Sequence, residues 1–344
     1  MKALVYKGAG TIELDDIEQQ APVGDESLIK VRAAGICGSD LEGFLGKTGR
    51  RIPPMVMGHE LAGTVKMPAP NSRLKKGDAV VVQPKLYCGK CAFCREGLTN
   101  LCSGAEFFGV MSKNGGMAEY LVVPERCLHH VKEGLDLQKA CLAEPLAVAC
   151  RAASQVPDKI LHRAEYTLLA GAGTIGLLIL QAIKLRGARN VIVSDMSDYR
   201  LDLAQKLGAE FRINPAKEDF LARVQEITSN RMADIAFEAV GFGASVSQAH
   251  SALKNRGTIV WVGLAQQMIE LDMHRVVTAE LKVRGSFLYS EEDFVNSLKL
   301  LESGEIQMDP IITKAVDLET GAEAFNELRN NKDGRIIKII LQPR

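Results

Sequence analysis

The chain has 344 residues, and its 42 basic and 42 acidic side chains leave no formal net charge. This balance gives no global field that would attract nucleic acid or an anionic membrane surface, so we expect neither as a partner. A chain of this length exceeds one ordinary hydrophobic core and predicts two domains. Hydrophobic residues make up 47% of the sequence and aromatic residues only 5%, which is typical of a soluble α/β protein.

The N-terminal sequence MKALVYKGAGTIEL contains an early lysine but no apolar segment of the kind found in a signal peptide. The most apolar stretch, residues 167–183, is interrupted by three glycines, and it does not predict a membrane span. A thiolate metal site and free thiols, which we expect from the cysteines discussed below, fit a reducing compartment. We therefore expect a cytoplasmic protein.

The first part of the chain carries short β-like runs at residues 3–6, 28–31, 79–83 and 118–123, separated by glycine, proline and charged clusters. This pattern predicts an irregular, mostly β domain over residues 1–150.

Four of the eight cysteines stand in one short stretch with the spacing Cys88-x-x-Cys91-x-x-Cys94-x7-Cys102. Zinc prefers four soft ligands at tetrahedral angles, and a loop of regularly spaced thiolates supplies them. A site closed by four thiolates has no position for a substrate, so we expect this zinc to be structural.

Residues 151–289 alternate apolar runs with helical stretches, which predicts βαβ units and a doubly wound parallel sheet. The tail, residues 290–344, contains two helical stretches and a final strand, RIIKIILQ. By sequence alone this strand could close either domain. We assign the tail to the first domain.

The segment GAGTIG follows a predicted strand and opens an apolar helix, as a dinucleotide-binding loop does. Its glycines allow a tight turn and close approach of a pyrophosphate to the helix N-terminus. Asp195 ends the next strand, where its carboxylate can bind the ribose hydroxyls and repel a 2′-phosphate, so NAD is expected rather than NADP. Arg200 could cover the adenine or only solvate its helix. The expected cofactor-binding residues are Gly171, Gly173, Thr174, Ile175, Gly176, Asp195, Arg200, Val240, Val262, Gly263, Leu264, Ser286 and Phe287.

Three scattered segments, GICGSD, GHE and AEPL, contain Cys37, His59 and Glu144. One thiolate, one imidazole and one carboxylate are a plausible zinc ligand set that leaves a fourth position open for catalysis. Taken singly, His59 could also be a hydrogen-bonded structural histidine and Glu144 a helix-start carboxylate.

The segments GICGSD, MVMGHE, GGMAEY, AEPLAVA and GAGTIG occur in register with the four-cysteine loop along essentially the whole chain. In this combination the sequence resembles the zinc-dependent medium-chain dehydrogenase/reductase superfamily, and most closely its polyol and sugar-alcohol branch. That branch includes sorbitol, butanediol and galactitol-phosphate dehydrogenases. The resemblance implies a GroES-like catalytic domain, a Rossmann domain, NAD, two zinc ions per chain and a homodimer or homotetramer.

The resemblance also implies roles for single residues. Cys37, His59 and Glu144 would bind the catalytic zinc, with Glu60 beside the metal as an alternate ligand. Zinc would lower the pKa of a secondary hydroxyl of the substrate, and hydride would pass to the nicotinamide ring. This catalytic centre is expected to lie within hydride reach of the dinucleotide.

Ser39 is implied as the group that takes the proton from the substrate hydroxyl, although it could instead cap the helix that begins near Asp40. Many members of the superfamily carry a relay histidine where this chain has Glu42. Either Glu42 substitutes for that histidine or water carries the proton.

The expected substrate is a polyol, a sugar alcohol or a vicinal diol. Residues 46–51 carry three cations, and Arg50 and Arg51 could clamp the phosphate of a sugar-alcohol phosphate, although such a run is also typical of a solvated loop. A threonine-type β-hydroxy acid is an alternative that the missing relay histidine weakens. A further alternative is a quinone-reductase-like relative or a zinc-stabilised, non-catalytic binding module, which zinc content and NAD binding would separate.

Overall fold

The computed structural model describes residues 1–111 and 113–344. The chain forms two compact units. The first unit contains Met1–Pro145, Ser290–Lys332 and Ile336–Arg344, and the second contains Leu146–Tyr289 and Asp333–Arg335. None of the helices in the described residues is long and apolar enough to cross a bilayer.

The first unit is mostly β, as the short β-like runs predict. Its largest sheet has the order β10-β6-β5-β3-β18-β17, with β9 also paired to β3. A smaller sheet has the order β2-β1-β4, and β7 pairs with β8. The strands are β1 (Lys2–Gly8), β2 (Thr11–Asp16), β3 (Glu26–Gly35), β4 (Met55–Val56), β5 (Glu60–Met67), β6 (Ala79–Val82), β7 (Lys85–Leu86), β8 (Glu106–Phe107), β9 (Tyr120–Pro124), β10 (Leu128–His130), β17 (Ile312–Asp317) and β18 (Lys338–Gln342).

The final strand, which by sequence alone could have closed either domain, belongs to the first unit. Strand β18 pairs antiparallel with β3 and parallel with β17. Four of its five residues are buried, as expected of a strand inside a sheet. The tail of the chain therefore completes the sheet whose other strands come from the first 130 residues.

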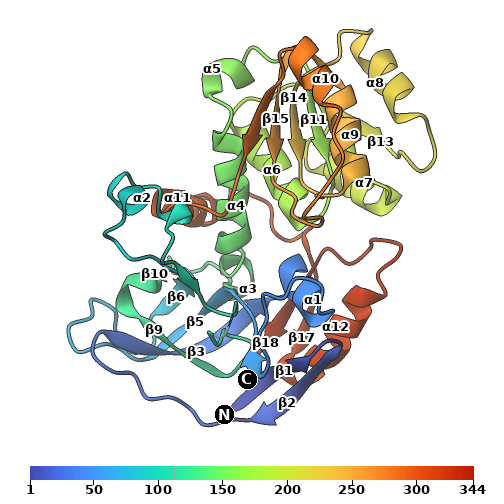
Figure 1. Cartoon of the computed structure of the whole chain (residues 1–344). Helices are drawn as coiled ribbons and strands as arrows, with labels where there is room; N and C mark the ends of the chain where they lie inside the picture. Colours follow the sequence, from blue (N-terminus) through green and yellow to red (C-terminus); the bar gives the residue numbers. More distant parts are fainter. Residues whose placement is uncertain (112) are drawn as a thin grey trace. The chain divides into compact units, whose positions relative to one another are not determined.

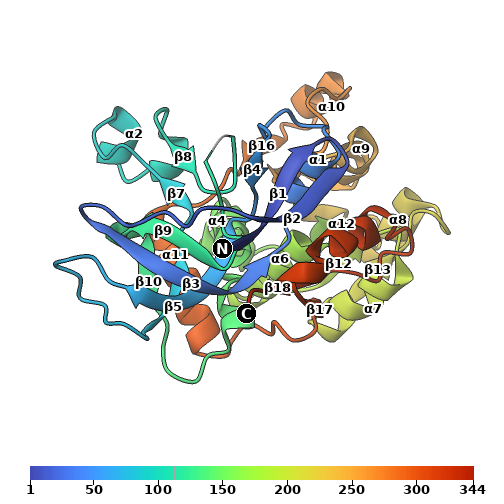
Figure 2. The same ribbon diagram turned by 90° about the horizontal axis from the view of Figure 1, so that it is seen from below.

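The helices of the first unit have between four and 12 residues. Helix α11 begins with a capping box, in which the Ser290 hydroxyl accepts the Asp293 N–H and the Asp293 carboxylate accepts the Ser290 N–H. In Figure 2, α2, β7 and β8 lie together at one edge of this unit. The helices are α1 (Gly38–Phe44), α2 (Ala92–Arg95), α3 (Leu137–Ala140), α11 (Glu291–Glu302) and α12 (Gly321–Arg329), with 3₁₀ turns at Thr99–Leu101, Glu125–Cys127 and Leu318–Thr320.

The second unit contains a parallel sheet with the strand order β13-β12-β11-β14-β15-β16. This is the order of a doubly wound dinucleotide-binding fold. In Figure 1, α6 and α9 lie along β11, β14 and β15. The strands are β11 (Thr167–Ala170), β12 (Val191–Ser194), β13 (Phe211–Ile213), β14 (Ala233–Glu238), β15 (Leu253–Trp261) and β16 (Lys282–Gly285).

The apolar alternation in the sequence reflects how these elements are buried. Strands β11 and β12 are buried along their whole length, and so is most of α6, because neighbours cover them on both sides. The helices are α5 (Asp158–Leu161), α6 (Thr174–Leu185), α7 (Asp198–Lys206), α8 (Phe220–Thr228), α9 (Gly243–Ser251) and α10 (Met273–Thr278), while α4 (Ala143–Ser154) runs across the boundary between the units.

Candidate active site

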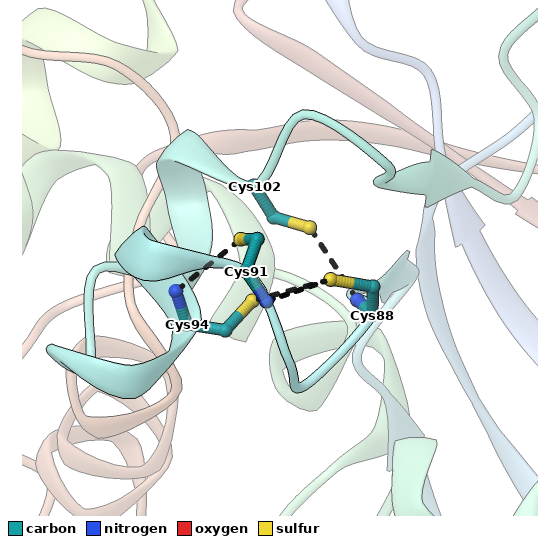
Figure 3. A group of neighbouring side chains, drawn as sticks. All are labelled: Cys88, Cys91, Cys94 and Cys102. Carbon is teal, nitrogen blue, oxygen red and sulfur yellow. Dashed lines mark hydrogen bonds between the residues drawn. The ribbon is translucent and has the colours of Figure 1, made fainter.

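The four-cysteine loop brings its sulfur atoms together. Those of Cys88, Cys91, Cys94 and Cys102 all lie within 4.8 Å of one another, and Figure 3 shows them converging on one point. Backbone N–H groups point at the sulfurs: Cys91 N donates to Cys88 Sγ at 3.4 Å and Cys94 N to Cys91 Sγ at 3.5 Å. The amides of Lys90 and Cys91 lower the pKa of Cys88 to about 6. Four convergent sulfurs from one short loop fit zinc in a closed structural site.

A second group of possible metal ligands comprises Cys37, His59 and Glu60, whose donor atoms also lie within 4.8 Å of one another. Cys37 stands between β3 and α1, while His59 and Glu60 stand where β5 begins. Because β3 and β5 are paired, with Gly35 opposite Glu60, two distant segments of the chain meet here. The donor set of thiolate, imidazole and carboxylate fits zinc.

Glu144, the third ligand implied by the resemblance, is not part of this group. It is buried, with 4% of its surface exposed, in the first turn of α4. Its role as a ligand therefore stays a prediction.

Glu60 is tied to a lysine from the last strand of the chain. Lys338 Nζ donates to Glu60 Oε1 at 2.7 Å, to Oε2 at 2.8 Å and to the Ile36 carbonyl at 2.9 Å. Both charged side chains are buried. Gly35 leaves room for this pair, because a Cβ at that position would lie 2.0 Å from Glu60 Oε2. Burial opposes the positive charge, but Glu60 and then Cys37 outweigh it and raise the pKa of Lys338.

His59 faces a second buried carboxylate. Its Nδ1 lies 3.5 Å from Asp40 Oδ1, and Arg51 Nη2 donates to the same oxygen at 2.8 Å. Asp40 also accepts the Cys37 N–H at 3.2 Å. Burial alone would raise the pKa of Asp40, but His59 and Arg51 reverse that effect and lower it. A carboxylate at Nδ1 leaves Nε2 as the ring nitrogen available to a metal.

This network corrects the interpretation of the basic loop. Arg51 is buried, whereas Arg50 is exposed, so the two do not form a pair of free guanidinium groups. The interpretation of Ser39 as a helix cap is also wrong. Helix α1 begins at Gly38 with Cys37 as its N-cap residue, and Ser39 lies exposed in the first turn.

Two polar side chains of α1 remain candidates for the proton route. The hydroxyl oxygen of Ser39 accepts a long hydrogen bond of 3.4 Å from Arg51 Nη2. Glu42 is half-buried, and burial raises its pKa although Lys47 opposes the shift.

The glycine loop of the second unit is tightly packed. Gly171 has φ +95°, which favours glycine, and a Cβ at Gly176 would lie 1.9 Å from the Gly171 carbonyl oxygen. Gly173 is the N-cap residue of α6, which Thr174 and Ile175 open. The loop thus presents a helix N-terminus to a phosphate group.

Asp195 and Arg200 lie near this loop. Asp195 Oδ2 accepts the Ala172 N–H at 2.8 Å, and Oδ1 accepts the Ser197 N–H at 2.9 Å. Arg200 Nε donates to the Gly334 carbonyl at 2.9 Å. Arg200 is therefore held by the segment Asp333–Arg335 and does not extend freely into solvent.

The ends of β14 and β15 meet through Gly241 and Gly263, where a Cβ on either residue would lie 2.4 Å or less from the other strand's backbone. A Cβ at Gly171 would lie 2.6 Å from a methyl of Val240, so this strand end also borders the glycine loop. The other predicted positions, Val262, Leu264, Ser286 and Phe287, stand at or beyond the ends of β15 and β16, with Leu264 and Phe287 exposed.

The residue that shapes this edge, Glu238, is not among the site residues predicted from the sequence. Glu238, fully buried at the end of β14, accepts the N–H groups of Val240 and Gly241 and the hydroxyl of Ser245. Asp40 and Lys338, the ion-pair partners of Arg51 and Glu60, are likewise absent from the predicted site residues. The sequence does carry a signal for Glu238. This carboxylate follows the apolar run IAF at the end of β14 and precedes Gly241, where a turn leaves backbone N–H groups that need an acceptor.

Comparisons with known proteins agree with this geometry. The alcohol dehydrogenase GroES-like domain matches residues 24–133, and the zinc-binding dehydrogenase domain matches residues 174–303. The sorbitol dehydrogenase of Bacillus subtilis is 30% identical over 100% of this chain and 97% of its own length. The L-threonine 3-dehydrogenase of Pyrococcus abyssi is 34% identical over 96% of each chain.

Among solved structures, galactitol-1-phosphate dehydrogenase from Escherichia coli superposes with a TM-score of 0.90 and 26% identity over 100% of both chains. The two domain matches and the full-length relatives show that the similarity is not limited to the short motifs but covers nearly the whole chain. The chain belongs to the polyol branch of the zinc-dependent medium-chain dehydrogenases, enzymes that oxidise alcohols with NAD.

Proposed function

We propose that the enzyme oxidises a secondary hydroxyl of an uncharged polyol, sugar alcohol or vicinal diol, with NAD as the hydride acceptor. The observation that carries the proposal is the group of half-buried Cys37 and buried His59 and Glu60, whose donor atoms lie close enough together to bind one metal ion. The glycine loop of the second unit supports the cofactor half of the reaction.

In this proposal Cys37, His59 and Glu144 hold the catalytic zinc, which as a Lewis acid lowers the pKa of the substrate hydroxyl when it is bound. Asp40 lies 3.5 Å from His59 Nδ1 and would leave Nε2 as the nitrogen that binds the metal. Lys338 occupies both oxygens of Glu60, so Glu60 acts as an alternate ligand that must first leave this lysine.

Ser39 takes the substrate proton in this mechanism. Its oxygen accepts from Arg51 Nη2, and since a guanidinium cannot accept a hydrogen bond, the Ser39 hydroxyl proton is free to point elsewhere. The proton then leaves through Glu42 or through water. A bound NAD would supply the nicotinamide ring as acceptor for the hydride from the carbon that carries this hydroxyl, and the protein would orient the ring.

Asp195 favours NAD over NADP, because a carboxylate at this strand end would repel a 2′-phosphate. Its hydrogen bond to Ala172 supports that placement, since it ties the carboxylate to the glycine loop. The burial of Arg51 favours an uncharged substrate over a phosphorylated one, because the guanidinium that would complete a phosphate clamp already binds Asp40.

The test is a screen for NADH production with polyols, polyol phosphates, vicinal diols and L-threonine, run in parallel with NAD and NADP. We expect the highest kcat/KM for an uncharged polyol or diol with NAD. A clear preference for a polyol phosphate or for threonine would overturn the substrate proposal. A preference for NADP would overturn the role of Asp195.

We also propose that the enzyme is a homo-oligomer, at least a dimer, built through β16. This strand is at the edge of its sheet, and all four of its residues are exposed. Two apolar side chains within or just after this strand are exposed, Val283 to 37% and Phe287 to 44%. An exposed edge with apolar neighbours invites pairing with a second copy. A solution mass of one chain, measured by sedimentation, would refute this.

We further propose that the protein is cytoplasmic. Its eight cysteines form no disulfide, which fits a reducing compartment.

A further inference from the structure

Buried cations are rare in the described part of the chain, and they cluster at the metal-donor groups. The lysine and arginine side chains buried there are Arg51, Lys85 and Lys338. Arg51 and Lys338 bind Asp40 and Glu60, beside the proposed catalytic zinc. Lys85 serves no part of that machinery, yet it is only 2% exposed. Burying an ammonium group costs several kcal/mol unless negative charge compensates it, so the position of Lys85 needs a reason.

The surroundings of Lys85 point to the four-cysteine loop. Lys85 lies in β7, just before Cys88, and its Nζ donates to the Thr99 hydroxyl at 3.2 Å. The Thr99 carbonyl accepts the N–H of Cys102 at 3.2 Å. Burial lowers the pKa of Lys85 to about 8, while its attraction to Cys102 and then to Cys94 opposes that shift. Thr99 therefore links the Lys85 ammonium group to the backbone of Cys102, one of the four cysteines.

Lys85 lies on the buried side of the four-cysteine loop, next to Thr99 and Cys102. Cys102 is the buried member of the four, whereas Cys88, Cys91 and Cys94 are partly exposed. Water can screen the charge of the three exposed thiolates, but it cannot reach Cys102 in the same way. The cation is thus placed where screening by solvent is weakest.

The charge of the loaded site explains why a cation is useful there. Four thiolates and one divalent zinc ion carry a net charge of about −2. The carboxylates of Glu291 and Asp293, at the start of α11, act on Lys85 in the same sense as the sulfurs and add negative charge nearby. Lys90 lies within the loop but is exposed, so its charge is screened.

We propose that Lys85 is a built-in countercharge, which offsets the negative charge of the zinc–tetrathiolate centre and so retains its zinc. This role is independent of the substrate and of the residues proposed for the second zinc. It acts through charge at short range and needs no contact with the metal itself.

The experiment compares zinc loss from wild-type protein and three variants in excess chelator. The zinc-loaded enzyme is sampled over time, alkylated, and the four cysteines of the loop are followed by peptide mass spectrometry, which separates them from Cys37. Lys85→Met should expose these cysteines at least about tenfold faster than wild type, the usual scale for outer-sphere changes at metal sites. Lys90→Met, a matched control for an exposed cation, and Thr99→Val, which removes the hydrogen bond but keeps the charge, should stay within about twofold.

Two results would overturn the proposal. Wild-type rates in Lys85→Met would show that the charge does not hold the zinc. An equal acceleration in Thr99→Val would show that packing and hydrogen bonding, rather than charge, are responsible. If Lys85→Met does not accumulate as folded protein, Lys85→Gln keeps the length and polarity of the side chain without the charge. Wild-type zinc retention in that variant would equally reject the countercharge.

Discussion

The two metal-donor groups differ in how the chain builds them. The four-cysteine group comes from one continuous stretch, and backbone N–H groups of that same stretch support its sulfurs. The group of Cys37, His59 and Glu60 is assembled from the ends of two paired strands. Its support comes from elsewhere in the chain, with Lys338 separated from Glu60 by 278 residues. The first group therefore depends on local spacing, and the second depends on the fold of the whole unit.

The strongest test of this difference removes one proposed ligand of each zinc ion. Glu144→Ala should lower kcat by about 10³-fold or more, since loss of the Lewis acid is worth several kcal/mol. The fold and the affinity for NAD should be nearly unchanged. Steady-state kinetics, zinc analysis and NADH binding measure these three properties.

Cys94→Ser is the matched variant for the four-cysteine site. It should also release one zinc per chain, but its main effect should be a lower thermal stability, with turnover of the folded protein within a few-fold of wild type. Near-normal activity in Glu144→Ala would show that Glu144 is not a catalytic ligand, and that Glu60 is the carboxylate to test next.

A second test addresses the buried ion pair of Arg51 and Asp40, which lies beside His59. Arg51→Met leaves the Asp40 carboxylate buried without its cation, and breaking such a pair typically costs about 3 kcal/mol or more of unfolding free energy. Chemical denaturation of the zinc-loaded protein measures this. Arg50→Met is the control, because Arg50 is exposed, and its change should stay within about 0.5 kcal/mol. Equal effects of the two substitutions would show that the buried pair contributes no special stability.

The same contrast explains how much of the molecule the sequence predicts. The cysteine spacing and the glycine loop are local patterns whose chemistry is visible in a few consecutive residues. The alternation after residue 165 likewise predicts the parallel sheet, because helices cover both faces of its strands. In contrast, the run KIILQ of β18 is apolar enough for either sheet, and only its pairing with β3 places it.

The burial of Arg51 is a feature that local patterns hide. A run of cations is typical of an exposed loop, and Arg50 follows that rule. Arg51 departs from it because Gly43 leaves space for its side chain; a Cβ at Gly43 would lie 2.4 Å from Arg51 Cγ. The buried anion that attracts it, Asp40, belongs to a motif whose spacing carries no sign of this partner. Such pairs become visible only when the fold brings their elements together.

A third test, with a smaller expected effect, asks whether Ser39 acts in proton transfer and not in metal binding at the site of Cys37 and His59. Ser39→Ala should lower kcat by about 10²-fold, at the lower end of what proton transfer by a side chain contributes, while both zinc ions stay bound. Ser39→Thr keeps a hydroxyl at the same place and should retain most of the activity. A larger solvent isotope effect on kcat in Ser39→Ala would locate the loss in the proton step. If Ser39→Ala turned over at the wild-type rate, the proton would leave by a route that bypasses this hydroxyl, and the hydrogen bond from Arg51 would serve only to position Arg51 on Asp40.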